Sequence, residues 1–162
     1  MRKQKSDQII TITSVGGLVG QPFNELYCGA KFAVEGFMEG LATYISDAFN
    51  IKISCVEPGG ILTEFMTSAI GKTAVEGKFA TVEYLPIFER YMAGNQKRAN
   101  ESKDQVYQTG LEVANVVLEV AQNENPPLRI RTSKWAEEFC NLKTQADADG
   151  SKIVQQLKDS FL

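Results

Sequence analysis

The chain has 162 residues, 43% of them hydrophobic and 23% charged, with a formal net charge of -3. This composition is typical of one soluble globular domain, and because both signs of charge are scattered along the chain, it offers no basic stripe for nucleic acid. Histidine is absent. Its absence excludes Ser-His-Asp catalysis and the commonest metal ligand, so any acid-base chemistry must use Tyr, Lys, Asp, Glu or Cys.

The three cysteines indicate a reducing compartment. Cys28, Cys55 and Cys140 are odd in number, far apart and inside segments that we expect to be structured. This pattern favours reduced thiols in a cytoplasmic protein over a disulfide framework.

No apolar run is long enough to span a bilayer, so we expect no membrane span. Asp147 and Asp149 lack the other oxygen ligands of a calcium loop, and we interpret them as a helix-breaking turn and expect no metal site.

The first part of the chain predicts two strands around one long helix. A β-branched run over Gln8–Thr13 indicates a buried parallel strand that ends in Ser14 and a glycine-rich loop. From Glu25 to Phe49, apolar residues recur at helical spacing beside a stripe of small residues that lets another backbone approach closely. Ile51–Val56 is the second predicted strand, and the turn Glu57–Gly60 closes it. The apolar positions are Val34, Phe37, Leu41 and Ile45, and the small ones are Gly29, Ala33, Gly36 and Gly40.

The middle segment is less regular than its neighbours. We expect a short helix over 63–70, then a cluster of apolar side chains in what looks like an insertion over a pocket. Four of them, Tyr84, Phe88, Tyr91 and Met92, either pack in a core or line that pocket, and the sequence leaves both possibilities open. The cluster comprises Phe79, Tyr84, Leu85, Ile87, Phe88, Tyr91 and Met92.

The last third predicts a helix, a strand and further helix. Thr109 and Glu112 form a capping-box pattern before an apolar repeat over Val113–Ala121, which indicates a helix that two prolines end. Leu128–Thr132 is the third predicted strand. Helical residues follow it to the carboxyl terminus, with a break at residues 147–150.

This order of elements is typical of a parallel sheet with right-handed crossovers. We therefore predict the α/β class and a partial, Rossmann-like, doubly wound sheet of about three parallel strands with flanking helices. The chain would be a single incomplete domain over 1–162. Its parts would be a catalytic region (1–70), a substrate-covering region (71–108) and a helix-strand-helix region (109–162).

Tyr27 and Lys31 stand four residues apart near the start of the long helix, so they share a face. An ammonium group near a phenol favours the phenolate and lowers the tyrosine pKa from its reference of about 10, which makes Tyr27 a candidate general acid and base. Ser14 follows the first strand, where its hydroxyl would project from the carboxyl end of the strand toward the same space. We expect these three residues to be catalytic.

The order of Ser14, then Tyr27-Cys28-Gly29-Ala30-Lys31, then Pro58-Gly59-Gly60-Ile61-Leu62-Thr63 resembles the active-site region of the short-chain dehydrogenase/reductase family. The resemblance implies NAD(P)-dependent hydride transfer between a secondary alcohol and a ketone. In that scheme Tyr27 passes the proton, Ser14 steadies the substrate oxygen, and Lys31 also binds the nicotinamide ribose. The residues implied to contact NAD or NADP are Tyr27, Lys31, Pro58, Gly59, Ile61 and Thr63.

The stretches Ser14–Asn24 and Phe32–Gly36, together with Pro126-Pro127-Leu128-Arg129, are similar to one branch of that family. This branch contains 17β-hydroxysteroid and photoreceptor-type retinol dehydrogenases. The similarity implies a small apolar alcohol or ketone as substrate, steroid-like or retinoid-like. It also implies a homo-oligomer that pairs through the long helix.

The sequence lacks the features that bind most of a dinucleotide. Such a site needs a glycine-rich turn leading directly into a helix and a ribose-reading residue about 20 residues further on. No such unit precedes Ser14, and more loop separates the glycines that follow Ser14 from the helix. We therefore expect the amino-terminal half of the family fold to be missing and the isolated chain to be impaired or inactive. The alternatives are a noncatalytic remnant that serves as an interaction module and one half of a split enzyme.

Overall fold

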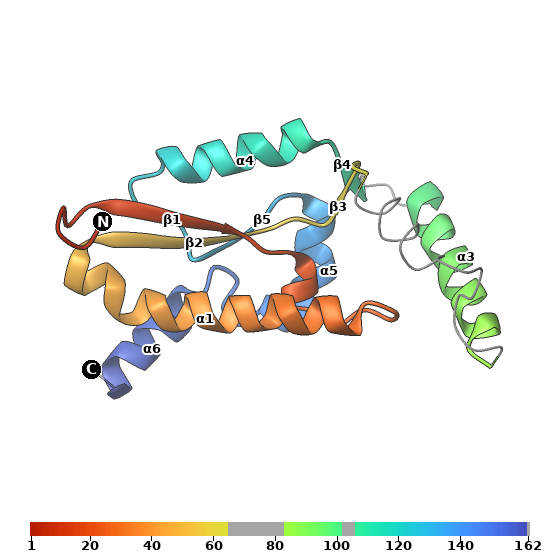
Figure 1. The fold of residues 1–162 in the computed structure, drawn as a ribbon, viewed down its shortest axis with the longest axis horizontal. Coiled ribbons are helices and arrows are strands. Elements are labelled where there is room, and N and C mark those ends of the chain that lie inside the picture. The colour runs from red at the N-terminus through yellow and green to blue at the C-terminus, as the bar shows by residue number, and fades with distance from the viewer. Residues whose placement is uncertain (65–82, 102–105, 162) are drawn as a thin grey trace.

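The computed structural model describes residues 1–64, 83–101 and 106–161. Its centre is a sheet of three parallel strands in the order β1-β2-β5. Helix α4 lies on one face of this sheet, and α1 lies on the other face with α6 beside it (Figure 1). The strands are β1 (Asp7–Ile12), β2 (Ile51–Glu57) and β5 (Arg129–Arg131).

Strand β2 is the central strand, and the sequence predicted it and its two neighbours. β1 pairs with β2 in parallel from Asp7 opposite Ile51 onward, and β5 pairs with the carboxyl-terminal end of β2. Most β2 side chains are buried, as expected for a strand covered on both faces. Thr13 also donates its backbone N–H to the Val56 carbonyl (2.7 Å), so pairing continues past the end of β1.

Helix α1 (Glu25–Phe49) has the bounds that the sequence predicted. It ends at Asn50, whose φ of 50° is left-handed, a conformation that Asn tolerates better than most residues. Phe37 shares the helical spacing of the apolar positions but is 66% exposed, whereas Glu35 is buried. The helix therefore turns a carboxylate toward the sheet and an aromatic ring away from it.

The main core lies between α1 and the sheet. Its buried residues come from α1, β2 and the residue that precedes β5, and Val154 of α6 packs against it. A smaller core joins α5 (Lys134–Thr144) to the loop after β1 through Val15, Ala136 and Cys140. The main core comprises Met38, Ala42, Ile51, Ile53, Cys55 and Leu128.

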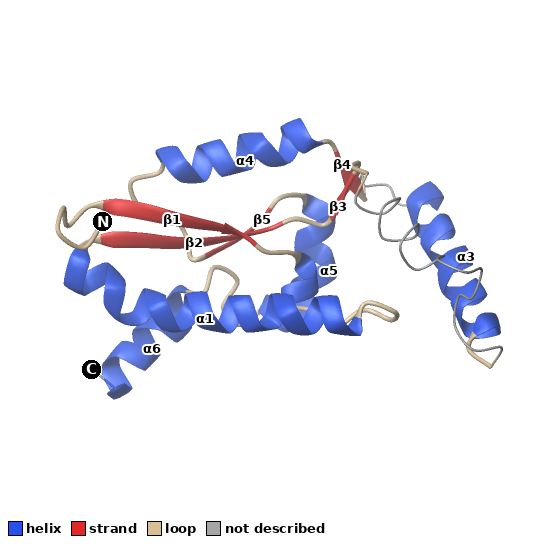
Figure 2. Cartoon of the chain, viewed as in Figure 1, coloured by secondary structure: helices blue, strands red, loops and turns tan. Residues whose placement is uncertain are grey.

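The middle segment contains two short strands that the sequence did not predict. β3 (Gly60–Ile61) and β4 (Tyr107–Gln108) pair in parallel as a separate two-stranded sheet. Helix α3 (Leu85–Glu101) extends away from the three-stranded sheet (Figure 2). Within the predicted apolar cluster, Tyr84, Leu85, Ile87 and Met92 are exposed. Most of the predicted helix over 63–70, and Phe79, lie outside the described residues.

The carboxyl-terminal helices begin where the sequence predicted. Helix α4 (Gly110–Gln122) has the predicted capping box: Thr109 N–H donates to Glu112 Oε2 (2.6 Å) and Glu112 N–H donates to Thr109 Oγ1 (3.2 Å). Helix α6 (Ser151–Phe161) follows the predicted break, and the Asp147 and Asp149 carboxylates accept from its first backbone N–H groups. None of the described helices is both long enough and apolar enough to cross a membrane.

Candidate active site

Ser14 is fixed where the carboxyl ends of β1 and β2 meet. It caps the short 3-10 helix Val15–Gly17, and its Oγ accepts from the Gly16 N–H at 3.0 Å. The same hydroxyl lies 3.5 Å from the Pro58 carbonyl, which also accepts from the Val15 N–H at 3.0 Å. The bond from Gly16 therefore holds the Ser14 oxygen in place, whereas the hydrogen bond that the hydroxyl donates to the Pro58 carbonyl is long and weak.

Tyr27 lies in the first turn of α1 and approaches the loop that Ser14 begins. A Cβ on Gly16 would lie 3.0 Å from Tyr27 Cε1, 3.4 Å from Ser14 Oγ and 3.5 Å from Cys28 Sγ. Three side chains thus converge around Gly16, and a Cβ there would be tightly placed against the Tyr27 ring. The Tyr27 side chain is 37% exposed, so its ring is accessible from solvent.

Lys31 lies one helical turn after Tyr27, on the same face of α1. Its Nζ lies 5.8 Å from the centroid of the Tyr27 ring, over the ring face. It also donates to the backbone carbonyl of Ile12, the last residue of β1, at 3.2 Å. The structure thus brings all three predicted catalytic residues to the carboxyl end of β1.

The four further residues implied to contact a cofactor lie along the segment that follows β2. Pro58 is buried and bonded to the Ser14 loop, while Ile61 lies in β3 and Thr63 follows it in an exposed turn. A Cβ on Gly59 would lie 2.9 Å from the Trp135 ring. The structure therefore joins Pro58 directly to the loop that Ser14 begins and places Ile61 and Thr63 further along the chain.

An aromatic contact near the site was missed by the sequence analysis. The Phe23 ring, just before α1, lies 5.2 Å from the rings of both Phe88 and Tyr91 of α3. Asn24 Nδ2 donates to Tyr91 Oη at 3.1 Å. These contacts attach α3 to the segment that leads into Tyr27. No spacing rule joins positions so far apart in the chain.

Six charged side chains from four elements also meet beside the site, and the sequence analysis missed this set. Arg131 Nη1 lies 3.1 Å from Glu57 Oε2, and Arg131 Nε lies 2.9 Å from Glu137 Oε2. Burial, and then the negative charge of Glu35, raise the pKa of Glu57 to about 8 despite the opposing effect of Arg131. We call the set the charge cluster. It comprises Glu35, Glu39, Glu57, Arg129, Arg131 and Glu137.

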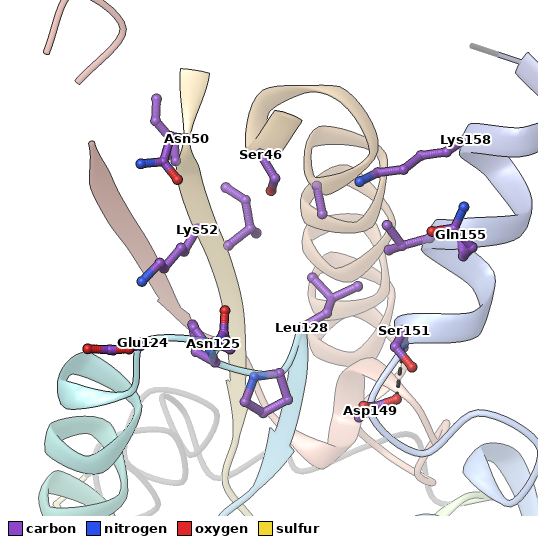
Figure 3. Close-up of a pocket in the computed structure, with 17 residues that line it drawn as sticks. Ser46, Asn50, Lys52, Glu124, Asn125, Leu128, Asp149, Ser151, Gln155 and Lys158 are labelled. Atoms are coloured by element: carbon purple, nitrogen blue, oxygen red, sulfur yellow. Dashed lines mark hydrogen bonds between the residues drawn. The ribbon is translucent and has the colours of Figure 1, made fainter. Parts of the chain in front are cut away.

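A cavity of about 490 Å³ lies at the opposite end of the sheet (Figure 3). It is lined by the end of α1, the start of β2, the segment before β5 and the start of α6. Lys52, Lys158, Glu124 and Asp149 contribute charges of both signs to its lining. It contains none of the predicted site residues, so it is separate from the candidate active site.

Comparison with known proteins identifies a family. Residues 1–73 match the short chain dehydrogenase family. Retinol dehydrogenase 8 from Bos taurus is 35% identical over 96% of this chain and 48% of its own length. Human 17-beta-hydroxysteroid dehydrogenase type 1 is 32% identical over 95% of this chain and 45% of its own length. The chain therefore spans about half the length of the curated relatives that it matches.

Solved structures agree on the fold. A short-chain dehydrogenase from Streptomyces avermitilis has a TM-score of 0.63 at 23% identity and covers 99% of this chain and 54% of its own. ElxO with NADP bound has a TM-score of 0.55 at 28% identity and covers 82% of this chain and 48% of its own. Sequence and fold together show that the chain belongs to the short-chain dehydrogenase family and resembles its branch of 17-beta-hydroxysteroid dehydrogenase type 1 and retinol dehydrogenase 8.

Proposed function

We propose that the chain carries the catalytic residues of an NAD(P)-dependent oxidoreductase that interconverts a secondary alcohol and a ketone. The observation that carries this proposal is the convergence of Ser14 and Tyr27 around Gly16, with the Lys31 ammonium over the tyrosine ring. A hydroxyl, a phenol and a cation at the carboxyl end of a parallel strand provide what alcohol oxidation needs from a protein without histidine.

Each of the three residues has a separate part in the proposed reaction. Tyr27, which is accessible from solvent, gives a proton to a ketone oxygen or takes one from an alcohol. Ser14 turns its weakly held hydroxyl from the Pro58 carbonyl to the same substrate oxygen. Lys31 holds its positive charge over the tyrosine ring, where it would stabilise the negative charge that develops as the proton moves.

The residues present fit the nicotinamide end of the cofactor. Lys31, whose ammonium lies at the end of β1, and Tyr27 beside it would hold the nicotinamide ribose. The nicotinamide, when bound, supplies or accepts the hydride. Pro58, Gly59, Ile61 and Thr63 are the proposed further contacts. ElxO holds NADP, which supports a nicotinamide cofactor for this family member, and the proposal covers both NAD and NADP.

The glycines after Ser14 do not supply the rest of a dinucleotide site. A Cβ on Gly17 would lie 2.8 Å from Glu35 Cγ and 3.2 Å from the Lys31 carbonyl oxygen. Gly17 is therefore needed for the close approach of α1. Because the groups that would hold the cofactor phosphates are not among these glycines, we propose that the chain alone binds the cofactor weakly and turns over slowly.

The proposed substrate is an apolar alcohol or ketone of steroid or retinoid type. The names of the two relatives, a hydroxysteroid dehydrogenase and a retinol dehydrogenase, support this class. The rings of Phe23, Phe88 and Tyr91 support it as well, because they place an apolar surface next to the start of α1. Lining of a substrate pocket is thus the interpretation of these rings that we favour over core packing.

The open edge of β1 favours a second candidate function. Among the described residues β1 pairs with β2 alone, so one row of its backbone N–H and C=O groups has no strand partner. Such an edge is a template for another strand. The second candidate is therefore an interaction module, or one part of a split enzyme, whose β1 edge pairs with a separate chain.

Cofactor binding and turnover separate these candidates. NADH and NADPH fluorescence should change when the purified chain is titrated to high concentration, and any alcohol oxidation should be lost in Tyr27→Phe, which removes the proton donor but keeps the ring. Cys28→Ser, beside Tyr27 on α1, is the matched control and should keep turnover. A well-folded chain that changes the fluorescence of neither cofactor would contradict the first candidate and leave the second.

A further inference from the structure

Arg129 of β5 is the residue of the charge cluster that faces the most carboxyl groups. Its Nε lies 3.7 Å from Glu35 Oε2 and 3.9 Å from Glu57 Oε1, and its Nη2 pairs with Glu39 Oε2. Glu35 and Glu39 lie one turn apart on α1, whereas Glu57 ends β2. One guanidinium group therefore bridges the helix that carries Tyr27 to the strand that leads into Pro58.

On the helix side, the charge cluster reaches the loop that begins with Ser14. Glu35 follows Lys31 by one helical turn, and its Cγ packs so closely on Gly17 that a Cβ there would lie 2.8 Å away. The Gly17 N–H donates to the Ser14 carbonyl at 2.8 Å. A shift of Glu35 would therefore move the contact between α1 and the turn that Ser14 begins.

On the strand side, the charge cluster reaches the same loop through Glu57 at the carboxyl end of β2. Glu57 directly precedes Pro58, whose carbonyl accepts from the Val15 N–H at 3.0 Å and faces the Ser14 hydroxyl. Arg131 holds the other carboxylate oxygen of Glu57 at 3.1 Å. Glu35 and Glu57, two of the three carboxyl groups that face Arg129, thus adjoin the backbone that positions Ser14.

Stability alone does not account for this arrangement. Glu35 Oε1, Glu57 Oε1 and Arg129 Nε are buried and form no hydrogen bond within the described residues. Buried ion pairs with unsatisfied atoms stabilise a fold less than well-packed apolar side chains of similar volume. What a guanidinium between three carboxyl groups does provide is one preferred position of the helix relative to the strands.

We infer that Arg129 is a positioning residue: it holds α1 in the position that keeps Tyr27 and Lys31 against the Ser14 loop. This role rests on the proposed function, because it matters for catalysis only if those residues are catalytic. The position of α1 against the Ser14 loop, however, can be measured without cofactor or substrate.

The rate at which a thiol reagent labels Cys28 reports whether α1 is in that position. Cys28 is buried between α1 and the Ser14 loop, with its Sγ 3.8 Å from the Val19 carbonyl oxygen. Cys140 is buried in the smaller core, where α5 rather than α1 packs against the loop after β1, and it reports opening of the fold beyond α1. Thiol labelling of the full chain, with each site quantified by peptide mass spectrometry, gives both rates in one experiment because labelling follows the population of the open form.

Two substitutions test the role of Arg129. In Arg129→Lys, which keeps the charge but not the fork of donors, Cys28 should label about tenfold faster than in the parent chain while Cys140 is unchanged. In Arg129→Met, which leaves the carboxylates unpaired, Cys28 labelling should rise further. The control is Lys158→Met: it removes the 2.7 Å pair with Asp47 at the other end of α1 and should leave Cys28 protected.

Every outcome decides the inference. Equal acceleration at Cys28 and Cys140 in Arg129→Lys would show that the cluster stabilises the whole fold and would overturn a positioning role, as would unchanged labelling at both. If Cys28 alone responds but Tyr27→Phe loses no turnover, the positioning of α1 stands and the proposed function fails.

Discussion

Glycine at position 17 allows a contact that no other residue permits. The ideal Cβ there meets both a side-chain carbon of Glu35 and the Lys31 carbonyl oxygen, which cannot move without the helix. Both of these atoms belong to α1. The distance between the Ser14 loop and the helix that carries Tyr27 and Lys31 is thus set by the absence of one methyl group.

We expect Gly17→Ala to lower the free energy of unfolding by about 1–3 kcal/mol, the usual effect of overpacking a tight contact. The matched control is Gly29→Ala on α1, where a Cβ meets no atom within 4 Å. That change should instead raise stability by about 0.5–1 kcal/mol, because alanine favours a helix more than glycine does. Urea denaturation of both variants measures the difference, and equal effects would contradict the contact.

Glu57 makes stability depend on pH in an unusual direction. Its folded-state pKa of about 8 is higher than the ordinary carboxyl value near 4.5, so the folded chain holds a proton there that the unfolded chain has released. The groups that face it are Glu35 of α1, and Arg129 and Arg131 of β5. The stabilising contribution is complete below pH 4.5 and is lost as the pH rises through about 8.

We therefore expect the free energy of unfolding to fall between pH 5 and pH 8, by up to about 1.4 kcal/mol per pH unit for this one group. Glu57→Gln carries no titrating proton, so its stability should vary less over the same range. Urea unfolding at several pH values measures both curves. Parallel curves for the parent chain and Glu57→Gln would show that another group controls the pH dependence.

At the scale of elements, helix α4 depends on its first turn. Thr109 and Glu112 satisfy each other's backbone N–H groups, and the Glu112 pKa is held below its usual value by its hydrogen bonds to Thr109. Val113 and Val120 are the helix residues buried against the rest of the chain. Loss of the Thr109–Glu112 hydrogen bonds would therefore weaken helix α4, which covers one face of the sheet.

Thr109→Ala should lower the free energy of unfolding by about 1 kcal/mol, the usual effect of losing a cap hydroxyl. Thr109→Ser keeps the oxygen that accepts from Glu112 N–H and should retain most of the stability. Thermal unfolding followed by circular dichroism compares the two variants. If serine lost as much stability as alanine, the hydroxyl would not be the stabilising group.

Local patterns predicted α1, α4 and the three-stranded sheet because each carries its own signal, whereas helix α3 was not predicted. Helix α1 and strand β2 follow from periodicity and from the Pro58 turn, and the start of α4 follows from Thr109 and Glu112. The pair β3 and β4 has no such signal, since two-residue strands are fixed by the chain around them. The same holds for the ring contacts of Phe23 and for the charge cluster, which depend on where distant segments meet.

The proposed catalytic residues were accessible to sequence analysis for a related reason. Tyr27 and Lys31 are joined by helical spacing, and Ser14 is tied to them by the direction of a parallel strand. The burial of Glu57 could not be read from the sequence, because a carboxylate at a strand end is ordinarily solvated. Only the convergence of four elements shows that it is enclosed.

For the molecule as a whole, the outer face of α1 is the surface that we propose for pairing with a second copy. Cβ atoms on Gly36 and Gly40 would meet nothing within 4 Å, so another backbone has room to approach there. Phe32 and Phe37 are exposed on the same helix. Small residues that admit a close approach, beside exposed aromatic rings, are suited to burial against an identical helix.

We expect the chain to be a dimer in solution and Phe37→Glu to make it a monomer, because a carboxylate in an apolar helix contact stays unpaired. Leu142→Glu on α5 is the control: Leu142 is 86% exposed, so that change adds the same charge at an apolar position outside the proposed interface. Light scattering distinguishes 17.9 kDa from twice that mass. A parent chain that is already monomeric would contradict the dimer. A dimer that both substitutions leave intact would place the contact elsewhere. In either case the open edge of β1 would be the better candidate for a partner.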